Sequence, residues 1–257
     1  MIRDAERPAD SLWLLAHDAG TGRPLLGPRV LGLGLAGALL AELLLGGLVR
    51  IDGGLVYDVG LQPYLRRVKH YARGLSIVGW CPLSYRPVNV ADADTLCPRC
   101  LEPGVEDMPE PLMRRLLRDI GAERSPRRVA DWLTVFSRDA PDLVTERLAQ
   151  DAWLFRQPYR NLLGRRRERW LAAQYLEAEK PAWTLRQVVH GEHPADAHHR
   201  VVAGFVEALG LSHAIFGDAR EARSAVAALQ AQLSPPLQYL IEQTKTMADD
   251  AVIAHTG

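Results

Sequence analysis

The sequence predicts a mainly α-helical protein that carries two β-hairpins. Residues 30–47 are almost entirely apolar and are long enough for several helical turns, and after Pro109 apolar residues recur at helical spacing. Two turn signals interrupt these helical patterns, one at Asp52-Gly53-Gly54 and one at Asn161 to Gly164, each between short apolar segments. The chain is 257 residues long, which is enough for one large domain with a substantial core.

The apolar stretch from residue 30 to 47 must first be tested as a membrane span. A spanning helix needs about 20 mostly apolar residues, and a carboxylate in its middle is costly. Glu42 interrupts this run, several glycines reduce its hydrophobicity, and a hairpin signal over residues 48–59 follows at once. We therefore expect a buried core helix that leads into a hairpin.

The remaining elements follow from periodicity and capping residues. Leu112, Leu116, Leu117 and Ile120 form an apolar stripe, and Gly121 follows it as a helix terminator. Ser125-Pro126 is typical of a helix start and Asp142 of another. We also expect a short element at 11–17, a hairpin over 153–171, and helices at 182–190, 195–209, 218–232 (with a capping box of Asp218 and Glu221) and 236–252.

Composition narrows the class of protein. The apolar content of 47% and charged content of 24% are those of an ordinary globular protein, and 31 basic residues balance 31 acidic ones. With no net charge, attraction to a membrane or a nucleic acid requires a local basic patch. The first residues lack the apolar core of a secretion signal, so we expect a cytoplasmic protein, with attachment to the membrane face as an option.

A segment of different character lies at residues 61–106, where prolines and glycines are frequent and all three cysteines occur. We interpret it as a loop-rich insertion in a single domain that spans residues 1–257. Cys97 and Cys100 form a CxxC pair, and Cys81 and His70 would have to complete a tetrahedral structural zinc site. The alternatives are three reduced cysteines with no cofactor, or a redox dithiol at Cys97 and Cys100.

Several segments resemble the Golgi phosphoprotein 3 family. Leu35 to Ile51 (LAGALLAELLLGGLVRI) is similar to the helix and strand that mark this family. The similarity extends over residues 12–60 and 106–250, and includes Arg127 to Leu133 and Glu146 to Ala149. The resemblance implies a helical bundle ringed by amphipathic helices and carrying hairpins. It also implies a non-enzymatic peripheral membrane protein that binds phosphatidylinositol 4-phosphate head groups and inserts a hydrophobic hairpin tip; in eukaryotes such proteins retain glycosyltransferases in the Golgi.

The head-group residues of that family do not carry over to this chain. The family uses one tryptophan and three arginines, and alignment on the two shared segments places Gly27, Ala36, Asp142 and Thr145 at these positions. Guanidinium forks are what hold a phosphate bidentately. The sequence therefore does not predict selective 4-phosphate binding at that site.

The second hairpin is the stronger candidate for a binding surface. Its six arginines flank an apolar tip, and Glu168 is the only acid among them; the candidate residues are Arg156, Arg160, Leu162, Leu163, Arg165, Arg166, Arg167 and Arg169. A basic rim around two leucines suits an anionic bilayer, where each surface arginine contributes about 1 kcal/mol. A solvated arginine face with inward leucines explains the pattern as well, and nucleic acid is a third, less favoured partner.

Four histidines, His190, His193, His198 and His199, lie close together in the sequence, but glycine and proline among them favour a turn between helices over a metal site.

The leading prediction is a non-enzymatic peripheral protein that binds anionic phospholipids through the arginine-rich hairpin. The alternative is a soluble module whose zinc-stabilised insertion contacts protein or nucleic acid.

Overall fold

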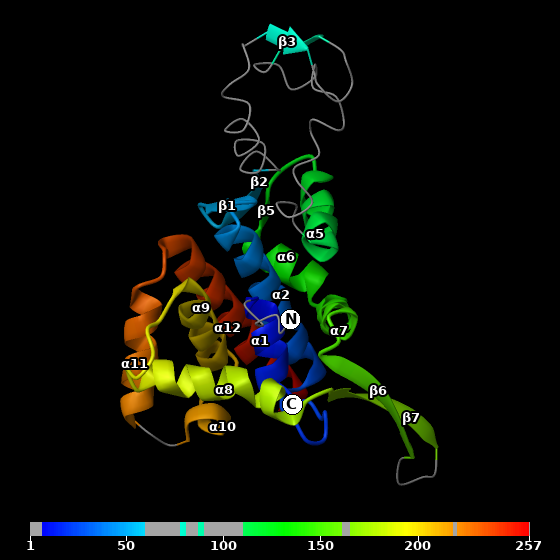
Figure 1. The fold of residues 1–257 in the computed structure, drawn as a ribbon. Helices are drawn as coiled ribbons and strands as arrows, with labels where there is room; N and C mark the ends of the chain where they lie inside the picture. The colour runs from blue at the N-terminus through cyan, green and yellow to red at the C-terminus, as the bar shows by residue number, and fades with distance from the viewer. Residues whose placement is uncertain are drawn as a thin grey trace.

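A computed structural model of the chain describes residues 7–59, 78–80, 87–89, 110–160, 165–217 and 220–256. Its ribbon is shown in Figure 1. The helices are α1 (Pro8–Leu15), α2 (Pro28–Leu45), α5 (Pro111–Gly121), α6 (Val129–Phe136), α7 (Ala140–Gln150), α8 (Tyr175–Val189), α9 (Ala197–Ala208), α10 (Ser212–Phe216), α11 (Arg220–Ala231) and α12 (Pro235–Thr256). The strands are β1 (Val49–Asp52), β2 (Leu55–Asp58), β3 (Val78–Trp80), β4 (Pro87–Asn89), β5 (Arg127–Arg128), β6 (Leu154–Arg160) and β7 (Arg166–Ala172).

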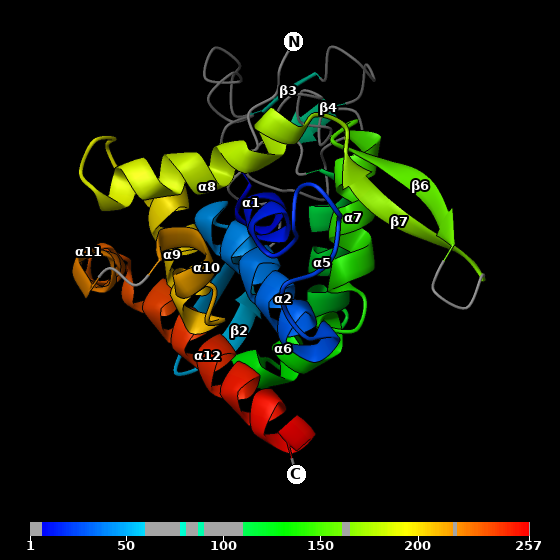
Figure 2. The same ribbon diagram turned by 90° about the horizontal axis from the view of Figure 1, so that it is seen from below.

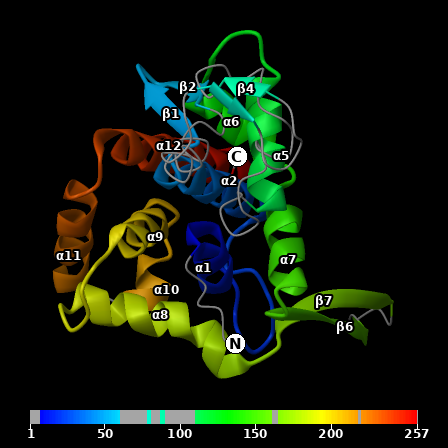
Figure 3. The ribbon, with the colours of Figure 1, turned by 45° about the horizontal axis from the view of Figure 1, so that its top comes forward.

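Helix α2 is the centre of the fold, as the sequence predicts. Pro28 occupies its first turn, where a missing N–H costs nothing, and Gly46 and Gly47 follow its last residue. It packs against α1, α6, α7, α9 and α12, which surround it in Figures 2 and 3. By length and composition it is the one helix among the described residues that is able to cross a membrane, but 72% of its most apolar window is buried inside the protein. It is a core helix.

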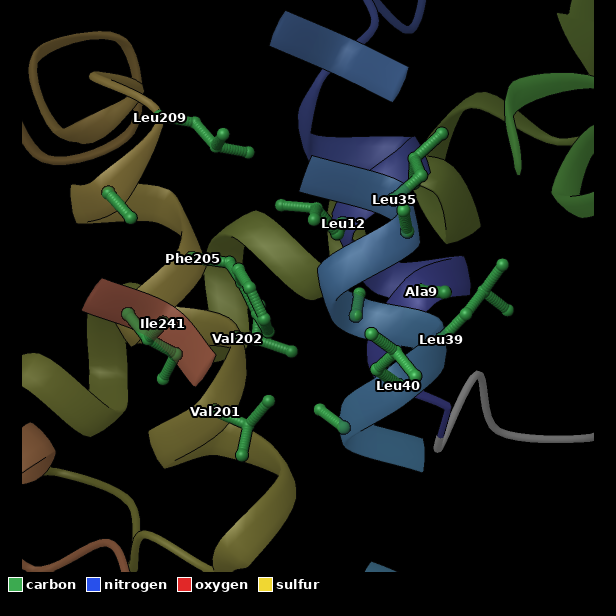
Figure 4. Close-up of a cluster of buried hydrophobic side chains, with 14 of the residues drawn as sticks. Ala9, Leu12, Leu35, Leu39, Leu40, Val201, Val202, Phe205, Leu209 and Ile241 are labelled. Carbon is green, nitrogen blue, oxygen red and sulfur yellow. The ribbon is translucent and has the colours of Figure 1, made fainter. Parts of the chain in front are cut away.

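Glycines on α2 let its neighbours approach closely. A Cβ atom at Gly37 would lie 2.7 Å from the ring of Phe205 and 2.7 Å from Oγ1 of Thr244, and one at Gly32 would overlap the carbonyl oxygen of Ser137. Figure 4 shows the resulting contact region, where Phe205 of α9 lies between Ile241 of α12 and the apolar side chains of α1 and α2. Close packing of this kind explains why small residues interrupt the apolar run.

Glu42, the single charge within that run, belongs to a buried ionic cluster. Its carboxylate accepts a hydrogen bond from the backbone N–H of Ala9 at 2.8 Å and is paired with Arg147 of α7. Arg147 also contacts Asp10 at 2.6 Å and Glu110, the residue just before α5. The cluster therefore joins α1, α2, α7 and the start of α5.

The first hairpin forms where the sequence predicts it. β1 and β2 pair antiparallel through Gly53 and Gly54, whose φ angles of +56° and +77° suit a tight turn. β5 pairs with the other edge of β2, in the order β1-β2-β5. The prediction that a helix starts directly after Ser125-Pro126 was wrong, because the next two residues extend the sheet and α6 begins at Val129, whose N–H donates to the carbonyl of Gly54 at 3.0 Å.

In the predicted insertion, the structure describes β3 and β4, which pair with each other antiparallel. The zinc candidates His70, Cys81, Cys97 and Cys100 lie outside the described residues. The zinc site and the interpretation of residues 61–106 as an insertion remain predictions.

The second half of the chain is helical as predicted, with shifted boundaries. α8 begins at Tyr175 rather than at residue 182 and continues through Pro181, and the short helix α10 was not predicted. Gly191 and Gly210 end α8 and α9 in the left-handed conformation, as their positions indicate. Asp142 lies inside the first turn of α7, and Asp218 of the predicted capping box is outside the described residues.

Candidate functional site

The second hairpin projects from the helical body, as Figure 1 shows. β6 and β7 pair over their full length, from Leu154 opposite Ala172 at the base to Arg160 opposite Arg166 toward the tip. Leu154 is buried and Trp170 packs against the core, so the base belongs to the body of the protein, whereas exposed residues predominate toward the tip of this two-stranded ribbon. A free-standing ribbon of this kind has little packing of its own and depends on its base for position.

The base is fixed by the loop between α1 and α2. Gly22 has a φ of +64°, and a Cβ atom there would overlap the carbonyl oxygen of Trp170 in β7. The guanidinium of Arg169 donates to the carbonyl oxygen of Thr21 at 3.3 Å, and also twice to Oε1 of Gln157 on the opposite strand, at 3.1 and 2.8 Å. Arg169 is thus a structural residue of the hairpin, and its guanidinium is already engaged by protein acceptors.

Arg156 has a different environment. Its guanidinium lies over the ring of Trp170, its cross-strand partner, at 4.7 Å from the ring centroid. Its distance of 3.6 Å from Glu168 is long for an ion pair, and both side chains are exposed, so this pair neutralises little of its charge. Arg156 therefore remains available to an anion.

The predicted tip is only partly described. Arg165 and Arg166 are exposed at the start of β7. Arg160 and Arg167 lie on the paired strands, while Leu162 and Leu163 lie outside the described residues. That these two leucines project outward toward a membrane remains a prediction.

The aromatic residues of the hairpin differ in exposure. Trp153 and Trp170 pack against the core. Phe155 and Tyr159 remain 45% and 39% exposed, and the guanidinium of Arg169 lies over the ring of Tyr159 at 5.4 Å from the ring centroid. The hairpin thus presents aromatic as well as basic side chains.

Two of the four positions that the resemblance assigns to a head-group site are buried here. Gly27 precedes α2, and Ala36 is fully buried in its middle. Thr145 is buried too, because its hydroxyl accepts a hydrogen bond from the indole of Trp13 at 2.8 Å and donates one to the carbonyl of Pro141 at 2.6 Å. Gly27 and Asp142, the latter on the first turn of α7, are exposed but offer no guanidinium group to a phosphate.

Three of the four clustered histidines, His193, His198 and His199, line a cavity of about 490 Å³ between α1, α8 and α9. His198 lies 3.2 Å from the hydroxyl of Ser11, and His199 lies 2.8 Å from Asp196, whose carboxylate caps α9. Within the described part of the chain, no group of three or more potential ligands has the geometry to hold a metal ion. Ser11 also lines this cavity, although it is only 2% exposed.

Fold and site together define a mainly helical protein whose body presents a basic, aromatic-bearing hairpin. Comparison with family models identifies it further: the model of Golgi phosphoprotein 3 (GPP34) matches residues 9–244, and the chain belongs to this family. The family is non-enzymatic and is linked in general to phosphoinositide and Golgi-related binding. A search of the curated proteins finds no match to the chain.

Proposed function

We propose that this protein is a non-enzymatic, peripheral membrane protein that binds anionic phospholipid head groups through the hairpin of β6 and β7. The observation that carries the proposal is the projecting ribbon with exposed arginines at its outer end and along its side, namely Arg156, Arg165 and Arg166. Surface arginines attract an anionic leaflet by about 1 kcal/mol each. Phe155 and Tyr159 add amphipathic rings of the kind that lie at the head-group level of bilayers.

The proposal does not depend on the head-group site of the eukaryotic proteins. Because Gly27, Ala36, Asp142 and Thr145 offer no guanidinium group, recognition should follow the charge of the lipid rather than the position of its phosphate. We therefore expect similar binding to phosphatidylserine and to phosphatidylinositol 4-phosphate at equal surface charge. Attachment of this kind is weak and reversible, and on this proposal the protein is cytoplasmic and moves between solution and the membrane face.

Liposome co-sedimentation tests the proposal. The protein should sediment with anionic vesicles and stay in solution with neutral phosphatidylcholine vesicles, and raised salt should release it because exposed charges are screened. The variant Arg165→Ala/Arg166→Ala/Arg167→Ala should lose binding. The control variant Arg114→Ala/Arg118→Ala/Arg223→Ala removes the same charge from exposed positions on α5 and α11 and should bind as the wild type does. Failure of the wild type to sediment at low salt would refute the proposal.

A further inference from the structure

Helix α8 carries apolar side chains on two opposite faces. Ala178, Ala182, Leu185, Val188 and Val189 are buried against the protein. On the other side Leu176 is 80% exposed and Trp183, seven residues later, is 57% exposed, with Lys180 between them on the same stripe. Tyr175, the first residue of the helix, is also 57% exposed. The core therefore covers only the first face, and within the described part of the chain Tyr175, Leu176 and Trp183 remain exposed on the other side.

The helix with the exposed face follows the hairpin directly in the chain. β7 ends at Ala172 and α8 begins at Tyr175, so Figure 2 shows the ribbon running directly into the first turn of the helix. Only Ala173 and Gln174 separate the two elements. The exposed side chains at the start of α8 therefore follow closely on the ribbon, which carries the exposed ring of Phe155 near its base.

The composition of the stripe favours a bilayer over a protein partner. Tryptophan and tyrosine with a leucine and a lysine are typical of helices that lie at a membrane surface, where rings and alkyl chains enter the head-group layer and the ammonium group stays in water. Together the three apolar side chains offer on the order of 300–400 Å². A specific protein interface buries about 800 Å² on each partner, so this stripe alone is too small for a stable dimer.

We infer that α8 is a second membrane-contacting element, which lies along the bilayer surface with Tyr175, Leu176 and Trp183 in the head-group layer while the hairpin binds anionic lipid. This inference rests on the proposed attachment through the hairpin and specifies its geometry. The hairpin supplies attraction to charge, and α8 supplies apolar contact at one end of the protein. Each contact orients the other, because only two residues join β7 to α8.

Co-sedimentation with phosphatidylcholine vesicles that contain phosphatidylserine tests the inference. The variant Leu176→Gln/Trp183→Gln should bind on the order of tenfold more weakly than the wild type, because two apolar side chains no longer leave water. The control variant Val252→Gln/Ile253→Gln changes two exposed apolar residues at the end of α12, which Figures 2 and 3 place away from α8, and should bind normally. Both pairs are on the surface, so unchanged thermal unfolding should show that both variants fold.

A second measurement reports contact directly. Lipids brominated near the head group quench tryptophan emission, and Trp183 is the only exposed tryptophan among those whose side chains the structure describes. Vesicle-bound wild type should be quenched, and Trp183→Phe, which keeps an aromatic ring and should still bind, should lose most of that quenching.

The outcomes separate this inference from the proposed function. If the wild type does not bind anionic vesicles, the proposed function fails and the inference fails with it. If the wild type binds but Leu176→Gln/Trp183→Gln binds equally well and quenching is unchanged in Trp183→Phe, the hairpin proposal stands and the role of α8 is refuted. A wild-type dimer that this double variant dissociates, without an effect on vesicle binding, would assign the face to a second copy of the chain and also refute the inference.

Discussion

Arg147 binds both carboxylate oxygens of Glu42: Nη1 donates to Oε2 at 2.9 Å, and Nη2 donates to Oε1 at 3.1 Å. The two residues are 105 positions apart, on α7 and α2, and both side chains are almost fully buried. This bidentate pair explains how the most apolar helix of the protein tolerates a carboxylate. It is the centre of a cluster in which two cations, Arg7 and Arg147, meet the carboxylates of Asp10, Glu42, Glu110 and Asp151.

Removing Arg147 should destabilise the protein strongly. Arg147→Met would leave Glu42 and Asp10 as buried carboxylates without their main cation, and breaking a buried pair in this way costs about 3–5 kcal/mol. The free energy of unfolding from urea titration measures the effect. Arg50→Met, which breaks an exposed pair with Asp52, is the control and should cost less than about 1 kcal/mol. Equal losses in the two variants would show that the cluster adds no stability.

The stability of the protein should depend on the protonation of Asp10. Burial raises the pKa of this carboxyl from 3.8 to about 7, against the opposing effect of Arg147, and the neighbouring charge of Glu42 raises it further. The folded state therefore binds the proton more tightly than the unfolded state. The stabilisation that protonation of Asp10 adds to the folded state is complete below about pH 4 and is lost as the pH rises through about 7.

Comparison of the wild type with the Asp10→Asn variant isolates the effect of Asp10 protonation on the free energy of unfolding. Between pH 5 and pH 8, the unfolding free energy of the wild type should fall relative to that of the variant by on the order of 2–3 kcal/mol. Burial lowers the pKa of His17, so this residue makes stability rise with pH. The effect of His17 is the same in both proteins and cancels when their free energies of unfolding are subtracted. Parallel pH profiles for the two proteins would contradict the assignment.

A methyl group at Gly32 should destabilise the core. The new Cβ atom would overlap the backbone carbonyl of Ser137, which a side-chain rotation cannot relieve, and overpacking of this kind costs about 1–3 kcal/mol. Gly27→Ala, before the same helix, has nothing within 4 Å of the new atom and should be tolerated much better. Thermal unfolding of both variants measures the difference; equal midpoints would rule out the clash.

The position of the hairpin should depend on Gly22. Gly22→Ala combines a left-handed backbone with a collision against the carbonyl of Trp170, so the contact between the loop and β7 should open. Gly53→Ala imposes a similar backbone strain with no atom within 4 Å and is therefore the matched control. Hydrogen exchange should speed up in β7 in the first variant only. Unchanged exchange in β7 would mean that the loop does not hold the hairpin.

The buried hydrogen bond between Thr145 of α7 and Trp13 of α1 should contribute to stability. Thr145→Val keeps the volume of the side chain but leaves the buried indole N–H of Trp13 without its acceptor, at a cost of about 1–3 kcal/mol. Thr134→Val on the exposed side of α6 loses only a hydrogen bond to its own helix and should cost well under 1 kcal/mol. Chemical denaturation of the two variants should show this difference. Equal losses of unfolding free energy in Thr145→Val and Thr134→Val would mean that the hydrogen bond to Trp13 does not contribute to stability.

The sequence alone determined the elements whose causes are local. The apolar run predicts α2, Gly53 and Gly54 predict the first hairpin, and Gly191 and Gly210 predict the ends of two helices, because periodicity and backbone conformation are properties of neighbouring residues. The arginine-rich hairpin was predicted as well, and the match to the Golgi phosphoprotein 3 family confirms the resemblance found in the sequence.

Tertiary structure alone decided which side chains share an environment. No local pattern pairs Glu42 with Arg147, and none shows that Arg169 is held by Thr21, a residue 148 positions away, while Arg156 stays exposed. The same holds for Leu176 and Trp183, because the sequence pattern of an apolar helix face does not show whether that face is buried or exposed. Burial is set by contacts between distant segments, so the exposed charges and rings could be assigned only from the folded chain.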